Sequence, residues 1–117
     1  MSAGLWIGIG LLGGLGAVAR VLLGAAVDAR ASTWFPWGTL AVNVSGAFAL
    51  GVLSGSAVAG DAHVLAATGF LGAFTTFSTW VVDARLLGGR RGAIDVATAL
   101  ALGLLAVWLG RELGALL

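Results

Sequence analysis

The feature that most constrains this chain is a series of four long apolar segments, separated by short connections that carry most of the charge. The segments cover residues 4–27, 37–58, 64–82 and 94–110. A helix rises about 1.5 Å per residue, so roughly 20 apolar residues cross the hydrocarbon core of a bilayer. We therefore expect an all-α integral membrane protein, with four transmembrane helices in a single domain covering residues 1–117.

Composition excludes several other classes of protein. Hydrophobic residues make up 60% of the 117 residues and charged residues 9%, whereas soluble domains average roughly 45–50% apolar and about 25% charged. Six basic residues against five acidic ones give no basic face, so we expect no nucleic-acid partner. There is no cysteine and no Ser/His/Asp set, so we expect no enzyme.

The carboxylates are expected at the ends of the segments or in the connections. They are Asp28, Asp61, Asp83, Asp95 and Glu112. A proton-coupled pump needs an ionisable group within the membrane. A proton-coupled exporter of small molecules is therefore the least favoured of the functions that fit a small membrane protein.

The third segment is polar where a membrane span is usually most apolar. The stretch GFLGAFTTFSTW at residues 69–80 contains two glycines and four hydroxyl side chains. One interpretation is an intact helix whose hydroxyls bond to the preceding turn. The other is a break near the centre of the helix, which is tolerated at membrane depth only where protein or a watery cavity meets the free backbone groups. The clustering favours the break, which we expect at Gly72 to Thr75.

The second segment has one small and polar helix face. Five residues recur along it at every fourth position, namely Thr39, Asn43, Ala47, Gly51 and Gly55. The small half of this face suits close packing against another helix. The amide of Asn43 needs hydrogen-bond partners within the membrane, either as a clamp between helices or as part of a polar path.

Arg20 lies well inside the first segment. A charge there is costly unless the side chain snorkels to the interface or faces a polar cavity. Snorkelling toward the end at Asp28 is a purely structural interpretation. The functional interpretation is an electropositive vestibule that concentrates an anion.

Three motifs occur in a fixed order along the first three segments: GGLGAVAR at 13–20, GTLAVNVSG at 38–46 and GFLGAFTTFST at 69–79. Together they resemble the Fluc/CrcB family of bacterial fluoride channels. The resemblance implies a passive, fluoride-selective channel that exports cytoplasmic fluoride across the bacterial inner membrane. It also implies a dimer of two antiparallel copies with dual topology, two narrow pores, and one structural sodium ion at the centre of the dimer interface.

The resemblance assigns particular residues to these ions. The backbone carbonyls of Gly72 and Thr75 would hold the sodium ion, with four carbonyls meeting on the two-fold axis. The fluoride path would be formed by Thr39, Asn43, Phe77, Ser78, Thr79 and Trp80. Phe77 would offer the positive edge of its ring to the anion. Trp80 stands where the family typically has a second phenylalanine, and ordinary packing of both rings is the structural alternative.

Arginines in the connections are distributed unevenly. Arg30, Arg85, Arg90 and Arg91 would lie on one side of the membrane and Arg111 on the other. The positive-inside rule then favours one orientation, with both termini outside. A fixed-topology subunit of a heterodimeric fluoride channel is therefore an alternative to the homodimer, and a non-conducting membrane scaffold is the alternative from another class.

Overall fold

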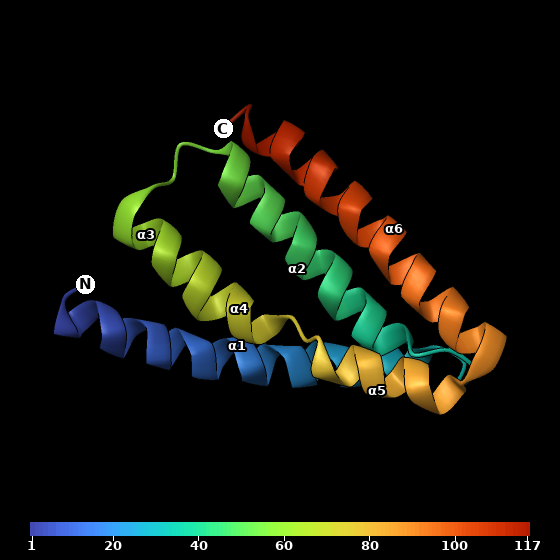
Figure 1. Cartoon of the computed structure of the whole chain (residues 1–117). Coiled ribbons are helices and arrows are strands. Elements are labelled where there is room, and N and C mark those ends of the chain that lie inside the picture. The colour runs from blue at the N-terminus through green and yellow to red at the C-terminus, as the bar shows by residue number, and fades with distance from the viewer.

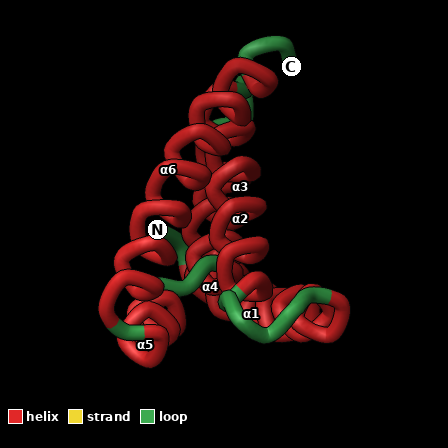
Figure 2. Tube along the Cα trace, turned by 90° about the vertical axis from the view of Figure 1, so that its right-hand side faces the viewer, coloured by secondary structure: helices red, strands yellow, loops and turns green.

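The computed structural model describes the whole chain, Met1–Leu117, as a bundle of helical rods without strands (Figures 1 and 2). Four rods are long and apolar enough to cross a membrane. They are α1 (Ala3–Arg30), α2 (Trp37–Gly55), a composite third rod (Gly60–Leu87) and α6 (Gly89–Gly114). The prediction of an all-helical protein with four membrane-spanning segments is confirmed.

The third rod is built from four pieces. These are α3 (Gly60–Val64), the π-helix η1 (Leu65–Leu71), α4 (Gly72–Phe74) and α5 (Ser78–Leu87). The loop between α4 and α5 interrupts the rod (Figure 2). The predicted break therefore exists, and it lies closer to the C-terminus than expected.

The break falls at residues 75–77 instead of 72–75. Gly72 keeps helical dihedral angles, with φ −59° and ψ −35°. Thr75 is the first extended residue, with φ −88° and ψ 159°. Glycine permits a break but does not require one, and the position is set instead by contacts that residues 75 and 76 make with α2.

The fourth rod begins at Gly89 instead of Ile94, because α5 and α6 are joined through the single residue Gly88, whose φ of 66° allows the sharp turn. Asp95 therefore lies inside a helix, and it is 1% exposed. Asp83 lies on α5, about one turn before its end at Leu87. The prediction that all carboxylates occupy span ends or loops was wrong for Asp95, so that argument against a proton-coupled exporter does not hold.

Glycines set how closely the rods approach. A Cβ on Gly51 or Gly55 would collide with the backbone of α6, and one on Gly110 or Gly114 would collide with the backbone of α2. The two helices accordingly lie side by side along their length (Figure 1). The expected packing of the small half of the α2 face against another helix is confirmed.

Helix α1 packs against η1 and α4 (Figure 1). At Gly16 an added Cβ would collide with the carbonyl oxygen of Phe70. This close contact holds the first rod beside the part of the third rod that precedes the break.

Most of the surface is apolar. Only 15 of the 117 residues are buried, and exposed large side chains such as Leu11, Leu22 and Leu104 occur along the rods. In water such a surface would drive aggregation, whereas lipid or a second protein chain covers it without cost.

The short connections lie at two opposite ends of the bundle (Figure 1). One end carries the two termini and the link between α2 and α3. The other end carries the loop at residues 31–36 and the turn at Gly88.

Candidate ion path at the broken helix

Asn43 on α2 is the partner of the broken backbone. Its Oδ1 accepts a hydrogen bond from the Thr76 N–H, and its Nδ2 donates to the Thr76 carbonyl, both at 2.8 Å. One carboxamide thus replaces both intrahelical bonds that this residue would make in a continuous helix. The break is held open by a side chain 33 positions earlier in the sequence.

Other side chains satisfy further groups at the break. The Thr76 hydroxyl accepts a hydrogen bond from the Thr79 N–H at 3.2 Å, as an N-cap side chain does. The Thr75 hydroxyl donates to the Leu71 carbonyl at 3.0 Å. The hydroxyl-rich sequence therefore has a local structural use, which is to end one helix and begin the next.

Arg20 reaches the break from α1. Its Nε donates a hydrogen bond to the Ala73 carbonyl at 3.2 Å. In a continuous helix the Phe77 N–H would use that carbonyl. The side chain therefore does not simply snorkel toward the end of α1, since it contacts the backbone immediately before the break.

Several backbone groups at the break have no hydrogen-bond partner within the chain. They include the carbonyls of Gly72 and Thr75 and the N–H groups of Phe77 and Trp80. The carbonyls present partial negative charge, and the N–H groups present partial positive charge, within a short stretch of chain. Such groups are stable at membrane depth only when an ion, water or another chain meets them.

An open cavity of about 360 Å³ lies beside the break. Its lining includes both free carbonyl residues and the predicted pore residues Asn43, Phe77 and Trp80. The rings of Phe77 and Trp80 meet edge to face, with centroids 5.7 Å apart. Phe77 is 72% exposed, so this chain alone leaves one side of the cavity unwalled.

Trp80, which lines this cavity, carries an unused donor. Its indole Nε1 is buried and has no hydrogen-bond partner within the chain. A buried N–H without an acceptor costs about 1–3 kcal/mol. The expected phenylalanine would not carry this donor.

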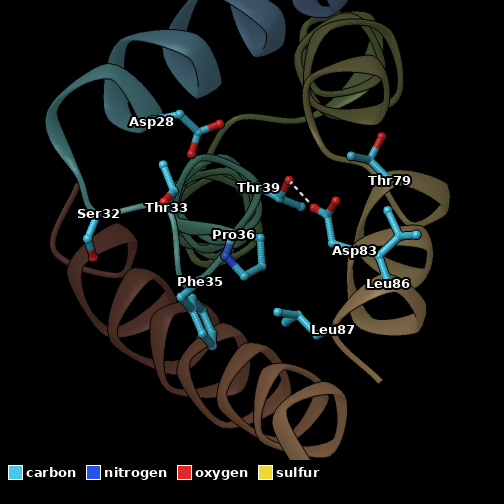
Figure 3. Close-up of a pocket in the computed structure, with 10 residues that line it drawn as sticks. All are labelled: Asp28, Ser32, Thr33, Phe35, Pro36, Thr39, Thr79, Asp83, Leu86 and Leu87. Carbon is cyan, nitrogen blue, oxygen red and sulfur yellow. Dashed lines mark hydrogen bonds between the residues drawn. The ribbon is translucent and has the colours of Figure 1, made fainter. Parts of the chain in front are cut away.

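A second cavity, of about 540 Å³, lies toward the end of the bundle that carries Gly88 (Figure 3). It is lined by the loop after α1, the start of α2 and one face of α5. Thr39 and Thr79 line it together. The Thr39 hydroxyl donates to Asp83 Oδ2 at 2.8 Å (Figure 3), so its proton is already used within the chain.

Asp28 also lines the second cavity and stabilises the start of α2. Its Oδ1 accepts a hydrogen bond from the Gly38 N–H at 2.8 Å. Pro36, at the N-cap position, has no side-chain group for this purpose, and a carboxylate at a helix N-terminus is favoured by the helix dipole.

The structure thus divides the predicted pore residues. Asn43, Phe77 and Trp80 share the first cavity, whereas Thr39 and Thr79 share the second. Ser78 is exposed on α5 and lines neither cavity. Sequence reasoning missed Thr76, Asp83 and Asp28. The two carboxylates were set aside as residues of span ends, although Asp28, nine residues before the start of α2, caps that helix.

Comparison with known proteins identifies the family. The family described as "CrcB-like protein, Camphor Resistance (CrcB)" matches residues 7–111. This chain belongs to the CrcB-like family. Membership, together with four apolar helices, makes it a multi-pass bacterial membrane protein rather than an enzyme.

Several curated relatives of this CrcB-like chain span nearly its whole length. "Fluoride-specific ion channel FluC 1" of Symbiobacterium thermophilum is 49% identical, over 93% of this chain and 96% of that protein. "Fluoride-specific ion channel FluC 2" of Mycobacterium tuberculosis is 44% identical, over 95% and 91%. "Fluoride-specific ion channel FluC" of Acidobacterium capsulatum is 42% identical, over 94% of each chain.

Proposed function

We propose that this chain is a passive, fluoride-selective channel that exports cytoplasmic fluoride. The observation that carries the proposal is the cavity at the broken third helix, which Asn43, Phe77 and Trp80 line together. N–H donors and ring edges solvate a small anion, and they do so without an ionisable side chain. The names of the relatives specify which anion.

We propose that the working unit is an antiparallel dimer with two pores. The first cavity is open, and Gly72 and Phe77 are exposed beside it. A single copy therefore leaves the path unwalled on one side. A second copy that covers this side would close it, and two-fold symmetry would then produce two equivalent paths.

A structural sodium ion fits the same arrangement. The carbonyl oxygens of Gly72 and Thr75 have no donor within the chain, and backbone carbonyls are ligands suited to a hard cation. Two copies would bring four such oxygens together. The ion would then neutralise carbonyl dipoles that otherwise face an apolar interface.

The test is fluoride efflux from liposomes that contain only this purified chain, followed with a fluoride electrode. Fast release of fluoride with retention of chloride under the same gradient is the expected result. Absence of fluoride release in vesicles that contain folded, dimeric protein would contradict the proposal and would favour a non-conducting scaffold.

Phe77→Ile separates the channel from the scaffold. Its side chain is 72% exposed, so the substitution removes the ring edge without creating an internal cavity. A channel should lose fluoride flux and keep its dimer.

A second experiment tests the sodium site. Replacing sodium by a large organic cation during purification should weaken the dimer if the carbonyl site holds the ion.

A heterodimeric subunit is the second candidate, and the arrangement of arginines favours it. Arg30, Arg85, Arg90 and Arg91 lie toward the end of the bundle at Gly88, and Arg111 lies toward the other end (Figure 1). This asymmetry favours a single orientation in the membrane. If the chain alone forms a two-fold dimer that conducts fluoride, the heterodimer hypothesis fails.

A further inference from the structure

We propose that a groove between α5 and α6 binds an anionic phospholipid, with its headgroup phosphate beside Arg85 and Arg90 and an acyl chain along α6. The groove has a volume of about 750 Å³ and is lined by Ala84, Arg85, Gly88, Gly89, Gly92, Ala93, Val96, Ala97 and Leu100. It lies apart from both cavities described above, and the proposal does not depend on fluoride conduction.

The shape of the groove comes from small side chains on one face of α6. Gly89, Gly92, Ala93 and Ala97 recur at intervals of three and four residues, which places them on one face. At Gly92 an added Cβ would collide with the Ala84 carbonyl, so α5 and α6 touch there and form the floor. The side of the groove away from this floor is open.

The groove is polar at one end and apolar at the other. Arg85 and Gly88 lie at the end where the chain turns between two membrane-spanning rods, which is the level of the membrane interface. Leu100 lies 12 residues beyond Gly88, or about 18 Å along the helix axis. A phospholipid is divided in the same way, with its phosphate at the membrane interface and its hydrocarbon chains below.

The charge at the polar end is not neutralised within the protein. Arg85 lines the groove, and Arg90 follows Gly89 at its rim. Both are exposed, and no side-chain hydrogen bond or ion pair involves them. Arg91 lies two residues after Gly89 and therefore about 200° around α6, away from the groove. The neighbouring carboxylate, Asp83, lies two residues before Arg85 and therefore about 200° around α5, on the face of the second cavity. Each arginine near a membrane surface contributes roughly 1 kcal/mol of attraction to anionic lipid.

Charge complementarity is therefore what selects the occupant. A zwitterionic lipid would present its own positive group to the arginines. An anionic phospholipid matches both the charge at the interface and the apolar wall below it.

The experiment titrates the purified full chain in neutral detergent with phosphatidylglycerol or phosphatidylcholine and detects bound lipid by native mass spectrometry. Wild type should retain phosphatidylglycerol and not phosphatidylcholine. The variant with Arg85→Gln and Arg90→Gln should bind about 30-fold more weakly, from roughly fivefold for each arginine. Arg111→Gln, at the other end of α6, is the matched control and should bind as wild type does.

A second variant tests the apolar half of the groove. Ala97 is exposed in the groove, so Ala97→Phe fills it without disturbing the contact between the helices, and lipid retention should fall while the melting temperature stays unchanged. Equal retention of the two lipids, or wild-type retention by both variants, would overturn the proposal. If glycerol phosphate bound as tightly as the lipid, the groove would be a phosphate site. If Ala97→Phe changed the oligomeric state, the groove would be a protein interface. Either result would also overturn the proposal.

Discussion

Replacing Asn43 tests whether its pairing with the broken backbone holds the ion path in shape. Asn43→Ala removes two hydrogen bonds of 2.8 Å and leaves the Thr76 N–H and carbonyl without partners. Each buried polar group left unpartnered costs about 1–3 kcal/mol. Because both groups are only partly buried, we take the lower half of this range, which gives about 2–4 kcal/mol in total.

That cost corresponds to roughly 30- to 1000-fold in the equilibrium between the paired break and competing conformations. We expect fluoride efflux to fall at least about tenfold, and the melting temperature followed by tryptophan fluorescence to fall with it. Asn43→Asp keeps the acceptor for the Thr76 N–H and loses the donor to the carbonyl, so its stability should be intermediate. Its negative charge should still abolish flux, because residue 43 lines the first cavity.

The control is Ser45→Ala, on the same helix. The Ser45 hydroxyl donates only to the Val42 carbonyl of its own helix, at 3.1 Å. This variant should keep wild-type flux and stability. If Asn43→Ala behaves like the control, the amide does not hold the break, and the account of the path given above is wrong.

Three further variants test neighbouring contacts. Trp80→Phe removes the buried, unpartnered N–H. The thermal stabilisation of the protein by added fluoride should therefore shrink, while the melting temperature without fluoride stays equal or rises. An undiminished effect of fluoride would exclude the indole as a ligand. Gly46→Val places side-chain atoms against Thr75 and should lower both stability and flux; wild-type behaviour would mean that α2 need not approach the break. Arg20→Lys keeps the charge and loses the guanidinium bond to the Ala73 carbonyl, so flux should fall if Arg20 positions the break; full flux in Arg20→Lys with loss in Arg20→Gln would show instead that only its charge matters.

The number of membrane spans could be predicted from the sequence, because an apolar segment must cover a fixed bilayer thickness. The existence of the break could be predicted because hydroxyls and glycines are unusual at that depth. Its position could not, because Asn43 pairs with Thr76 across 33 residues and nothing local distinguishes residue 76 from residue 75. The sequence predicted that the Asn43 amide needs hydrogen-bond partners in the membrane. It did not predict which backbone groups these would be.

Asp95 shows how an error in a predicted helix boundary changes the expected location of a charged residue. Asp95 was expected near the end of a span that began at Ile94, and the helix begins instead at Gly89. The two glycines at 88 and 89 favoured a loop, but with φ values of 66° and 46° they make the turn with only Gly88 outside the helices. A shift of five residues in one boundary moved an acidic group from the expected interface to a buried position.

The second cavity limits how fluoride can be bound toward the end at Gly88. The Thr39 hydroxyl directs its proton to Asp83, so in this arrangement the oxygen presents only lone pairs to the cavity, and these repel an anion. Thr79 lines the same cavity, and its hydroxyl makes no hydrogen bond to another side chain or to the backbone. Of the two threonines, Thr79 is therefore the one that can donate to fluoride, and Thr39 can do so only if its bond to Asp83 is broken.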